Sequence, residues 1–189
     1  MRSSENTPSP SLRPAIPLLL LLAGEDHPKA CTGRRLLHRG LARPVRRIAS
    51  LRPPPIVLDP HAADPLSMAD RSLARRGGVL AVDCSWNRLA RRGSLPGLAS
   101  DDGGIHRRLP ILVAGNPQHF GRIAELNTVE ALSAALYVLG RRADAAHLLE
   151  GFRGGDGFLT INRERLDFYA SRRTADAVRV AERTLYGGA

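Results

Sequence analysis

Short, uninterrupted apolar runs recur along the first part of the chain. They span Ile16–Ala23, Ile56–Leu58, Val79–Val82 and Ile111–Ala114. Strands that are apolar on both faces are typical of a parallel sheet that is covered on both sides, because neither face meets water. The runs therefore predict an α/β fold with a mostly parallel sheet and covering helices. Ser67–Arg76, which opens with a serine suited to capping a helix, is expected to form one crossover helix.

The pattern changes to helical spacing after Ala114. Asn127 and Glu130 predict a capping box, in which the Asn127 side chain accepts from the Glu130 amide and the Glu130 carboxylate reaches back. Apolar residues then repeat at helical spacing as far as Gly140, which is suited to ending a helix. Three further helices are expected over Arg141–Phe152, Asn162–Tyr169 and Thr174–Tyr186. No strand is predicted in this part, so the sequence indicates an all-helical carboxyl-terminal domain.

The amino-terminal segments predict neither a signal peptide nor a membrane span. Residues 1–14 are rich in Ser, Pro and polar groups and are expected to form a disordered tail. Ile16–Ala23 is too short to cross a bilayer, and Glu25 and Asp26 follow it without a small-residue cleavage pattern. We therefore expect a soluble, cytoplasmic protein with no membrane partner.

The charge of the chain favours a polyanionic partner. The formal net charge is +10, and Lys29 is the only lysine, so arginine supplies nearly all of the excess. Arginine bias also arises from a GC-rich genome or from selection at high temperature, so charge alone leaves the partner open. Cys31 and Cys84 are too few for a disulfide framework or a four-thiolate site. The six histidines show no metal-ligand spacing, and no metal is expected.

Five motifs, read in chain order, carry a resemblance to a known family. They are DHPKACTGRRL, VLDP, VDCSW, LPILVAGNP and LNTVEALSAALY, and the resemblance runs from about Glu25 to Tyr169. In this order and spacing they resemble the ribosome-biogenesis aminocarboxypropyltransferases, which modify the small-subunit ribosomal RNA of archaea and eukaryotes. The resemblance implies transfer of the 3-amino-3-carboxypropyl group from S-adenosylmethionine to a pseudouridine or its N1-methylated form, with release of methylthioadenosine.

The resemblance also implies an architecture and partners. It predicts a deep trefoil knot like that of the SPOUT methyltransferases, together with an α/β domain over residues 15–108. The knot strand and the helical domain then occupy residues 109–189. The expected partner is small-subunit ribosomal RNA or a pre-ribosomal particle, and the protein is expected to be a monomer.

The same resemblance implies a site for S-adenosylmethionine at the junction of the two parts. Trp86 and Leu89 would enclose the methyl group, which leaves the side-chain carbon next to sulfur open to attack. The other residues expected to bind the cofactor are grouped by the part of the cofactor that each would contact. They are Leu58, Pro60, Leu126 and the backbones of Leu109 and Ala124 for adenine, the Val82 carbonyl for ribose, and Thr32, Asn127 and Thr128 for the amino-acid end.

Asp83 and Trp86 are the expected catalytic residues. Asp83 is the carboxylate nearest to the expected sulfonium and is a candidate to accept the imino proton of the base. Each assignment has an alternative: Trp86 as a core anchor, Asn127 as a cap alone, and Asp83 as a structural carboxylate. RNA contacts are expected from a set of arginines that are equally consistent with solvated surface. They are Arg34, Arg35, Arg39, Arg43, Arg46, Arg47, Arg107 and Arg108.

The sequence departs from the family pattern at four positions. Relatives usually carry Ser at Asn127, Tyr at Phe120, Pro at Met68 and Trp at Gly154. Asn remains a good helix cap and Phe keeps an aromatic ring, so the cofactor site is expected to survive these changes. Two rival functions stay open at this point: a SPOUT-like RNA methyltransferase that uses the same cofactor, and a noncatalytic ribosome-assembly factor that binds RNA.

Overall fold

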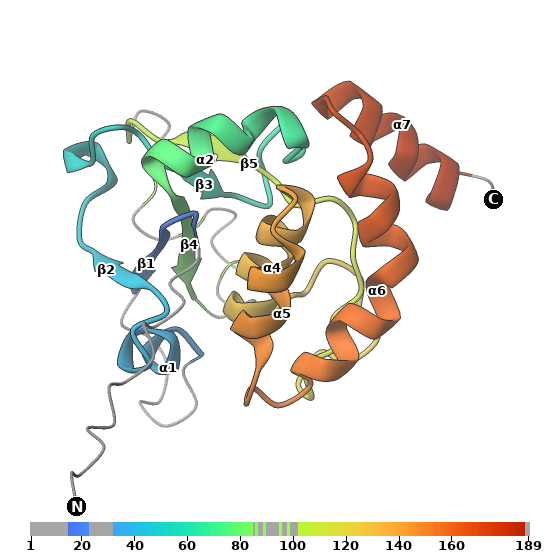
Figure 1. Cartoon of the computed structure of the whole chain (residues 1–189), viewed down its shortest axis with the longest axis horizontal. Helices are drawn as coiled ribbons and strands as arrows, with labels where there is room; N and C mark the ends of the chain where they lie inside the picture. The colour runs from blue at the N-terminus through green and yellow to red at the C-terminus, as the bar shows by residue number, and fades with distance from the viewer. Residues whose placement is uncertain are drawn as a thin grey trace, which may run out of the picture.

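A five-stranded parallel sheet forms one side of the protein, and helices pack beside it (Figure 1). The computed structural model describes residues 15–22, 32–84, 86, 89, 95, 98 and 102–187. The predicted tail over residues 1–14 and Cys31 lie outside the described residues. The strands are β1 (Leu18–Leu22), β2 (Arg43–Val45), β3 (Ile56–Leu58), β4 (Val79–Asp83) and β5 (Ile105–Arg107). Their order across the sheet is β2-β1-β4-β3-β5, and every pair is parallel.

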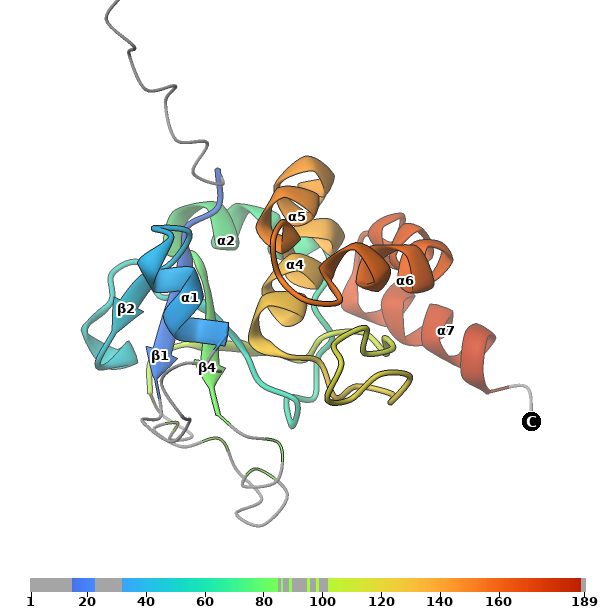
Figure 2. The same ribbon diagram turned by 90° about the horizontal axis from the view of Figure 1, so that it is seen from below.

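The helices fall into two groups along the sequence, one between the strands and one after the last strand. Those of the first half are α1 (Thr32–His38), the 3-10 turns η1 (Ile48–Ser50) and η2 (Met68–Asp70), and α2 (Arg71–Gly77). Those of the second half are α4 (Thr128–Val138), α5 (Arg142–Leu149), α6 (Gly155–Ala170) and α7 (Ala175–Tyr186). In both Figure 1 and Figure 2, α4 and α5 lie between the sheet and the outer pair α6 and α7. No helix in the described part of the chain is long and apolar enough to span a membrane.

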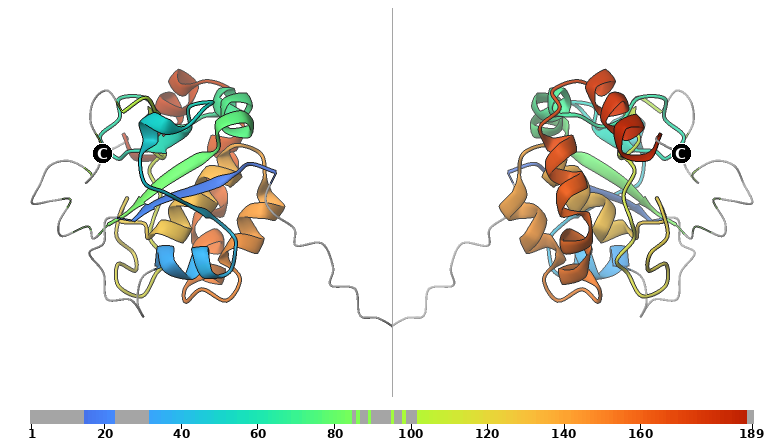
Figure 3. Two further views of the ribbon diagram at one scale, coloured as in Figure 1. Left: turned by 90° about the vertical axis from the view of Figure 1, so that its left-hand side faces the viewer. Right: turned by 90° about the vertical axis from the view of Figure 1, so that its right-hand side faces the viewer.

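The two faces of the sheet are covered differently. β1 and β4 run side by side in the same direction (Figure 3), and successive side chains of each strand point to opposite faces. Leu18, Leu20 and Ala81 belong to a large core shared with α1, α2, α4, α5, α6 and α7. Leu19 and Leu80 belong to a smaller cluster on the other face, which is closed by η1 and its neighbours. Within the described residues, α-helices therefore cover one face of the sheet, and η1 with its neighbours covers the other.

One predicted strand is wrong, and its physical reason is visible. Ile111–Ala114 contributes only an isolated antiparallel bridge between Val113 and Ile123. The Val113 amide donates to Asn162 Oδ1 (2.9 Å), and Asn162 Nδ2 donates to the Val113 carbonyl (2.7 Å). The fully buried Asn162 side chain thus satisfies the backbone groups that a neighbouring strand would otherwise bind.

Several predicted helix boundaries are corrected. The helix expected over Ser67–Arg76 is divided into η2 and α2, and the one expected over Asn162–Tyr169 begins earlier, at Gly155. Thr32 lies in the first turn of α1. Gly140 does end α4, as predicted, with a φ of +75°.

Candidate functional site

A cavity of about 850 Å³ lies where β3 and β4 end. Parallel sheets bind ligands at the carboxyl ends of their strands, because the loops that leave the sheet there meet at one edge. The lining residues come from four parts of the chain: the end of β4 with Trp86, Leu89 and Leu95, the segment after β3, residues 108–111, and the stretch from Gln118 into α4. Thr32 at the start of α1 completes it. All eleven residues expected to bind the cofactor line this one cavity: Thr32, Leu58, Pro60, Val82, Trp86, Leu89, Leu109, Ala124, Leu126, Asn127 and Thr128.

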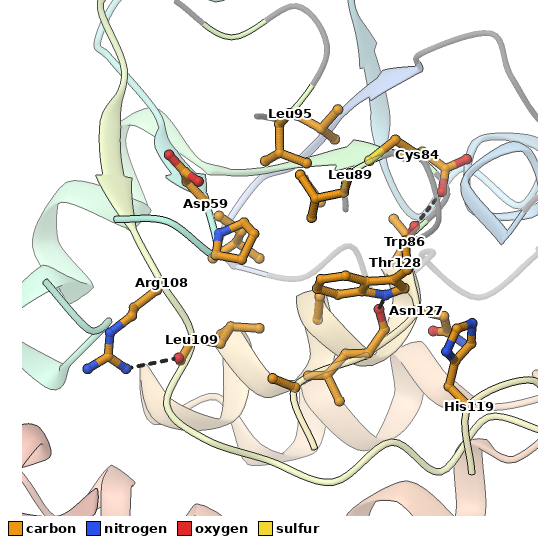
Figure 4. Close-up of a pocket in the computed structure, with 18 of the residues that line it drawn as sticks. Asp59, Cys84, Trp86, Leu89, Leu95, Arg108, Leu109, His119, Asn127 and Thr128 are labelled. Atoms are coloured by element: carbon orange, nitrogen blue, oxygen red, sulfur yellow. Dashed lines mark hydrogen bonds between the residues drawn. The ribbon is translucent and has the colours of Figure 1, made fainter. Parts of the chain in front are cut away.

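Trp86 joins two walls of the cavity. Its indole Nε1–H donates to the backbone carbonyl of Leu126 over 2.7 Å, as Figure 4 shows. Leu89 is buried on the same side, with 6% of its surface exposed. The indole is therefore held in one orientation by a hydrogen bond and offers its apolar ring as cavity wall.

The start of α4 has the predicted capping box. The Glu130 amide donates to Asn127 Oδ1 (2.9 Å), and the Asn127 amide donates to Glu130 Oε2 (2.9 Å). Glu130 also accepts from the Gly115 amide (2.9 Å) and from Asn116 Nδ2 (2.7 Å). Burial raises the pKa of Glu130 despite these donors. This buried carboxyl group therefore fixes both the first turn of α4 and the Gly115-Asn116 turn that leads toward the cavity.

Asp83 ties the end of β4 to the start of α4. Thr128 Oγ1 donates to Asp83 Oδ1, and the Asp83 side chain is buried. A Cβ built on Gly33 would lie only 2.6 Å from Asp83 Oδ2, so α1 also packs directly against this carboxylate. The contacts support the alternative that Asp83 organises the site, with Thr128 and α1 as its neighbours.

The apolar wall expected to contact adenine includes one residue, Ala124, with a positive φ. Leu58 and Leu126 are buried, and Ala124 adopts a left-handed conformation with a φ of 62°. The Ala124 amide donates to the Leu112 carbonyl over 2.8 Å. Its carbonyl is therefore the backbone group through which Ala124 can contact a ligand.

Two of the arginines expected to bind RNA hold the protein together. Arg108 donates to both carboxylate oxygens of Glu182 in α7, at 2.6 and 2.8 Å, and Glu182 Oε1 also accepts from the Ile111 amide (3.2 Å). The Glu182 carboxylate raises the pKa of Arg108. Arg107 Nε donates to the buried Asp70 over 3.1 Å. Both side chains thus fix the segment that lines the cavity, and they are poor candidates for phosphate contacts.

Two further arginines also have internal partners. Arg35 and Arg39 lie over the ring of Phe152, at 4.6 and 5.2 Å from its centroid. They donate to the carbonyls of Gly151 (2.8 Å) and Glu150 (2.6 Å), respectively. These contacts join α1 to the turn between α5 and α6. The other four arginines expected to bind RNA are exposed, namely Arg34, Arg43, Arg46 and Arg47.

Two polar clusters at the cavity were missed by the sequence analysis. His119 lines the cavity, and its Nδ1 is hydrogen bonded to Glu125 Oε2. Asp59, another lining residue, contacts His106 Nδ1 at 2.9 Å, and His106 Nε2 contacts Asp102 at 3.1 Å. His119 lies inside the segment that resembles the family. The only sequence feature that could have indicated its contact is a glutamate six residues later, which is not a spacing typical of catalysis. No group of three or more His, Cys, Asp or Glu side chains among the described residues is arranged so that it could hold a metal ion.

The chemistry of the cavity suits a nucleoside that carries an amino acid. Leucine, proline and tryptophan side chains supply apolar walls for a flat base, whereas Asp83, Thr32, Thr128 and the amino end of α4 supply polar groups at one side. Fold and site together define an α/β protein that binds a nucleotide-like ligand at the carboxyl edge of a parallel sheet.

Comparisons with known proteins identify the family. Residues 56–186 match the model of the family "Ribosome biogenesis protein, C-terminal", so the chain belongs to that family. The 16S rRNA aminocarboxypropyltransferase of Methanopyrus kandleri is 41% identical over 90% of this chain and 99% of its own length. The 18S rRNA aminocarboxypropyltransferase of Schizosaccharomyces pombe is 36% identical over 89% of this chain and 56% of its own length.

A solved structure has the same fold. The SAM-dependent rRNA acp-transferase Tsr3 from Vulcanisaeta distributa superposes with a TM-score of 0.76 and 30% identity, over 92% of this chain and all of that chain. The expected family and the parallel α/β fold are therefore confirmed.

Proposed function

We propose that this protein transfers the 3-amino-3-carboxypropyl group of S-adenosylmethionine to a pseudouridine, or its N1-methylated form, in small-subunit ribosomal RNA. The observation that carries the proposal is the convergence of all eleven motif-derived residues on one cavity. Relatives along nearly the whole chain are named as enzymes of this activity. The cavity volume of about 850 Å³ lies within the range of about 300–1,000 Å³ usual for small-molecule sites.

The proposed binding mode assigns each wall to one part of the cofactor. Leu58, Pro60 and Leu126 enclose adenine, the backbones of Leu109 and Ala124 read its edge, and Val82 receives the ribose hydroxyls. Thr32, Asn127 and Thr128 hold the amino-acid end. Asn127 caps α4 and also lines the cavity, so its two proposed roles are compatible.

Selectivity among the carbons on sulfur is assigned to Trp86 and Leu89. The bound cofactor supplies an electrophilic carbon on a positively charged sulfur. The methyl carbon is the least hindered of the three, so a wall must cover it if another carbon is to react. The indole fixed by Leu126 and the buried Leu89 side chain offer such an apolar wall. Trp86 thus acts catalytically by orientation, which contributes strongly to rate when the reacting atoms are held in line.

Asp83 is proposed to favour the cationic cofactor through its charge and to position Thr128. Its contacts with Thr128 and α1 support this role better than proton transfer. The attraction of a carboxylate for a sulfonium lowers the free energy of the bound cofactor more than that of the transition state, because the positive charge fades during transfer.

The remaining architectural proposals concern the knot, the domains and the location. We propose that residues 109–189 contain the knotted segment, which is not a strand at Ile111–Ala114, and a helical domain whose core is continuous with the α/β domain of residues 15–108. Core residues on both sides of this boundary pack in one cluster, which supports joint folding. The protein is proposed to act as a cytoplasmic monomer on ribosomal RNA or a pre-ribosomal particle.

Product analysis tests the function directly. Purified protein is incubated with S-adenosylmethionine and unmodified small-subunit RNA, and the nucleoside products are separated by mass. Methylthioadenosine together with an RNA base heavier by an aminocarboxypropyl group is the expected result. S-adenosylhomocysteine and a methylated base would instead identify a methyltransferase, and RNA binding without cofactor binding would identify an assembly factor.

A further inference from the structure

The histidine in the cavity wall is fixed in place by its own loop. The His119 amide is close to both Asn116 Oδ1 (3.0 Å) and the Asn116 carbonyl (3.2 Å). The loop closes on itself because the Gly121 amide donates to the Ala114 carbonyl over 2.9 Å. Figure 4 shows the imidazole near Asn127, at the end of the cavity proposed to hold the amino-acid part of the cofactor.

The partner of His119 determines which ring nitrogen carries the proton. The hydrogen bond from His119 lowers the pKa of Glu125, and Arg122 Nη1 adds a contact to the same carboxylate at 3.1 Å. Glu125 is therefore ionised at neutral pH and can only accept. The carboxylate accepts from Nδ1–H, which leaves Nε2 as the ring nitrogen that can exchange a proton with a substrate. A base oriented by a carboxylate is the arrangement expected for proton transfer.

Three other titratable side chains of the cavity, Asp59, Asp83 and Arg108, are held by partners within the protein and are less suited to take a proton from a substrate. Cys84 lines the cavity as well. Asp59 contacts His106 with one oxygen and accepts from the His61 amide with the other, each at 2.9 Å. Asp83 accepts from Thr128 and is buried against α1, and Arg108 is paired with Glu182.

An exposed aromatic ring adjoins the histidine. Phe120, the next residue, is 69% exposed although it is one of only four phenylalanines in the chain. Exposed aromatic rings beside a site bind unpaired nucleobases by stacking, because every base has an apolar face. A base turned out of its RNA stack can thus reach a loop that offers both a ring and a proton acceptor.

We propose that His119, oriented by Glu125, is the general base that removes the ring N–H proton of the acceptor nucleobase. This assignment rests on the proposed function. The acceptor nitrogen loses its proton to His119 Nε2 and uses the freed electron pair to bond the side-chain carbon next to sulfur. The carbon–sulfur bond breaks with its electrons going to sulfur, and neutral methylthioadenosine leaves. The imidazolium then returns its proton to water.

The experiment compares His119→Asn and Glu125→Gln with His147→Asn. His147 makes the same kind of contact, Nδ1 to Glu150 over 3.2 Å, on the exposed surface of α5 outside the cavity. Single-turnover transfer to RNA is measured from pH 5 to 9, with cofactor affinity measured by calorimetry on each variant. The expected loss for His119→Asn at pH 7 is about 100-fold or more in rate, with cofactor affinity within about threefold, partial rescue by added imidazole, and no change for the His147 control.

A substrate-free measurement tests the dyad itself. The His119 ring nitrogens are observed by NMR at a fixed pH, with their signals assigned by their loss in His119→Asn. Glu125→Gln is expected to shift the Nδ1 signal, because the Nδ1–H then loses its carboxylate acceptor. The charged groups that face His119 from its own loop are Glu125 and Arg122. Asp83 and Cys84 line the cavity from the end of β4, and Glu125→Gln leaves both unchanged.

Three results would overturn the assignment. An unchanged rate in His119→Asn excludes proton transfer, and an unchanged Nδ1 signal in Glu125→Gln excludes the dyad. A higher dissociation constant for the cofactor with a normal rate at saturation would make His119 a contact for the cofactor carboxylate instead. Wild-type protein that releases S-adenosylhomocysteine or no product would refute the proposed function itself, which separates that failure from a failure of the base assignment.

Discussion

The indole N–H of Trp86 donates to the backbone carbonyl of Leu126, 40 positions further along the chain, over 2.7 Å. This hydrogen bond and the one from Thr128 to Asp83 join the end of β4 and the segment after it to the start of α4. The two walls of the cavity are therefore set relative to each other by two side-chain contacts, and both walls were expected to contact the cofactor.

Replacement of Trp86 separates its hydrogen bond from its ring. Trp86→Phe keeps an apolar ring but loses the bond, which contributes about 1 kcal/mol, so cofactor affinity should fall about fivefold. Trp86→Ala removes the wall as well and should weaken binding by a further factor of about ten or more. Calorimetry with S-adenosylmethionine measures both. Equal affinity of the two variants and the wild type would exclude Trp86 from the cofactor site.

The Arg108–Glu182 ion pair should contribute far more to the free energy of unfolding than an exposed ion pair does. Glu182→Gln leaves the Arg108 guanidinium in a site where only 24% of its side chain is exposed, and it weakens the contact to the Ile111 amide. We expect a loss of about 2 kcal/mol in the free energy of unfolding. The matched control, Glu150→Gln, breaks a pair whose side chains are 45% and 63% exposed and should cost under about 0.5 kcal/mol. Urea unfolding measures the loss of unfolding free energy in both variants. Equal losses in Glu182→Gln and Glu150→Gln would contradict the prediction.

Glu130 gives a stability difference that depends on pH. Its folded-state pKa is raised above the ordinary value of 4.5 by burial, so the folded protein binds a proton more readily than the unfolded chain. The stabilisation that Glu130 contributes is complete below the unfolded pKa and declines as the pH rises through the folded one. The difference in unfolding free energy between wild type and Glu130→Gln should therefore be larger at pH 4 than at pH 7. A difference that grows toward pH 7 would show that the hydrogen bonds outweigh burial.

The exposed arginines near β2 are expected to bind phosphate. A triple Arg43→Gln, Arg46→Gln, Arg47→Gln variant should bind ribosomal RNA more weakly, and its salt dependence should fall by about 0.7 to 0.9 in log–log slope for each phosphate that is no longer neutralised. The control removes the same charge from exposed arginines elsewhere, namely Arg153, Arg163 and Arg183. Equal slopes for the two triple variants would show that total charge, rather than this surface, determines affinity.

The helices and strands that could be predicted from the sequence are those whose structure depends on local residues. β3 and β4 are continuous apolar runs, and the capping box at Asn127 contains both of its hydrogen-bonding partners within four residues. β2 and β5 were missed because their sequences, Arg-Pro-Val and Ile-His-Arg, lack an apolar run. They become strands only by pairing with β1 and β3.

Long-range partners account for the remaining differences. Ile111–Ala114 is apolar like a strand, but Asn162 binds the Val113 backbone from a distance of 49 positions. Arg107 and Arg108 look like phosphate ligands until their partners Asp70 and Glu182 are known. The cofactor residues could be named from motifs, whereas the His119–Glu125 contact needed coordinates because neither residue has a spacing diagnostic of catalysis.

The fate of a carboxyl label in S-adenosylmethionine distinguishes aminocarboxypropyl transfer from methyl transfer to small-subunit RNA. The label lies in the part of the cofactor that an aminocarboxypropyltransferase moves and a methyltransferase leaves behind. Label is expected to enter RNA in proportion to the methylthioadenosine released, and Trp86→Ala is expected to reduce both. Label that stays with S-adenosylhomocysteine, while RNA gains only a methyl group, would contradict the proposed aminocarboxypropyl transfer.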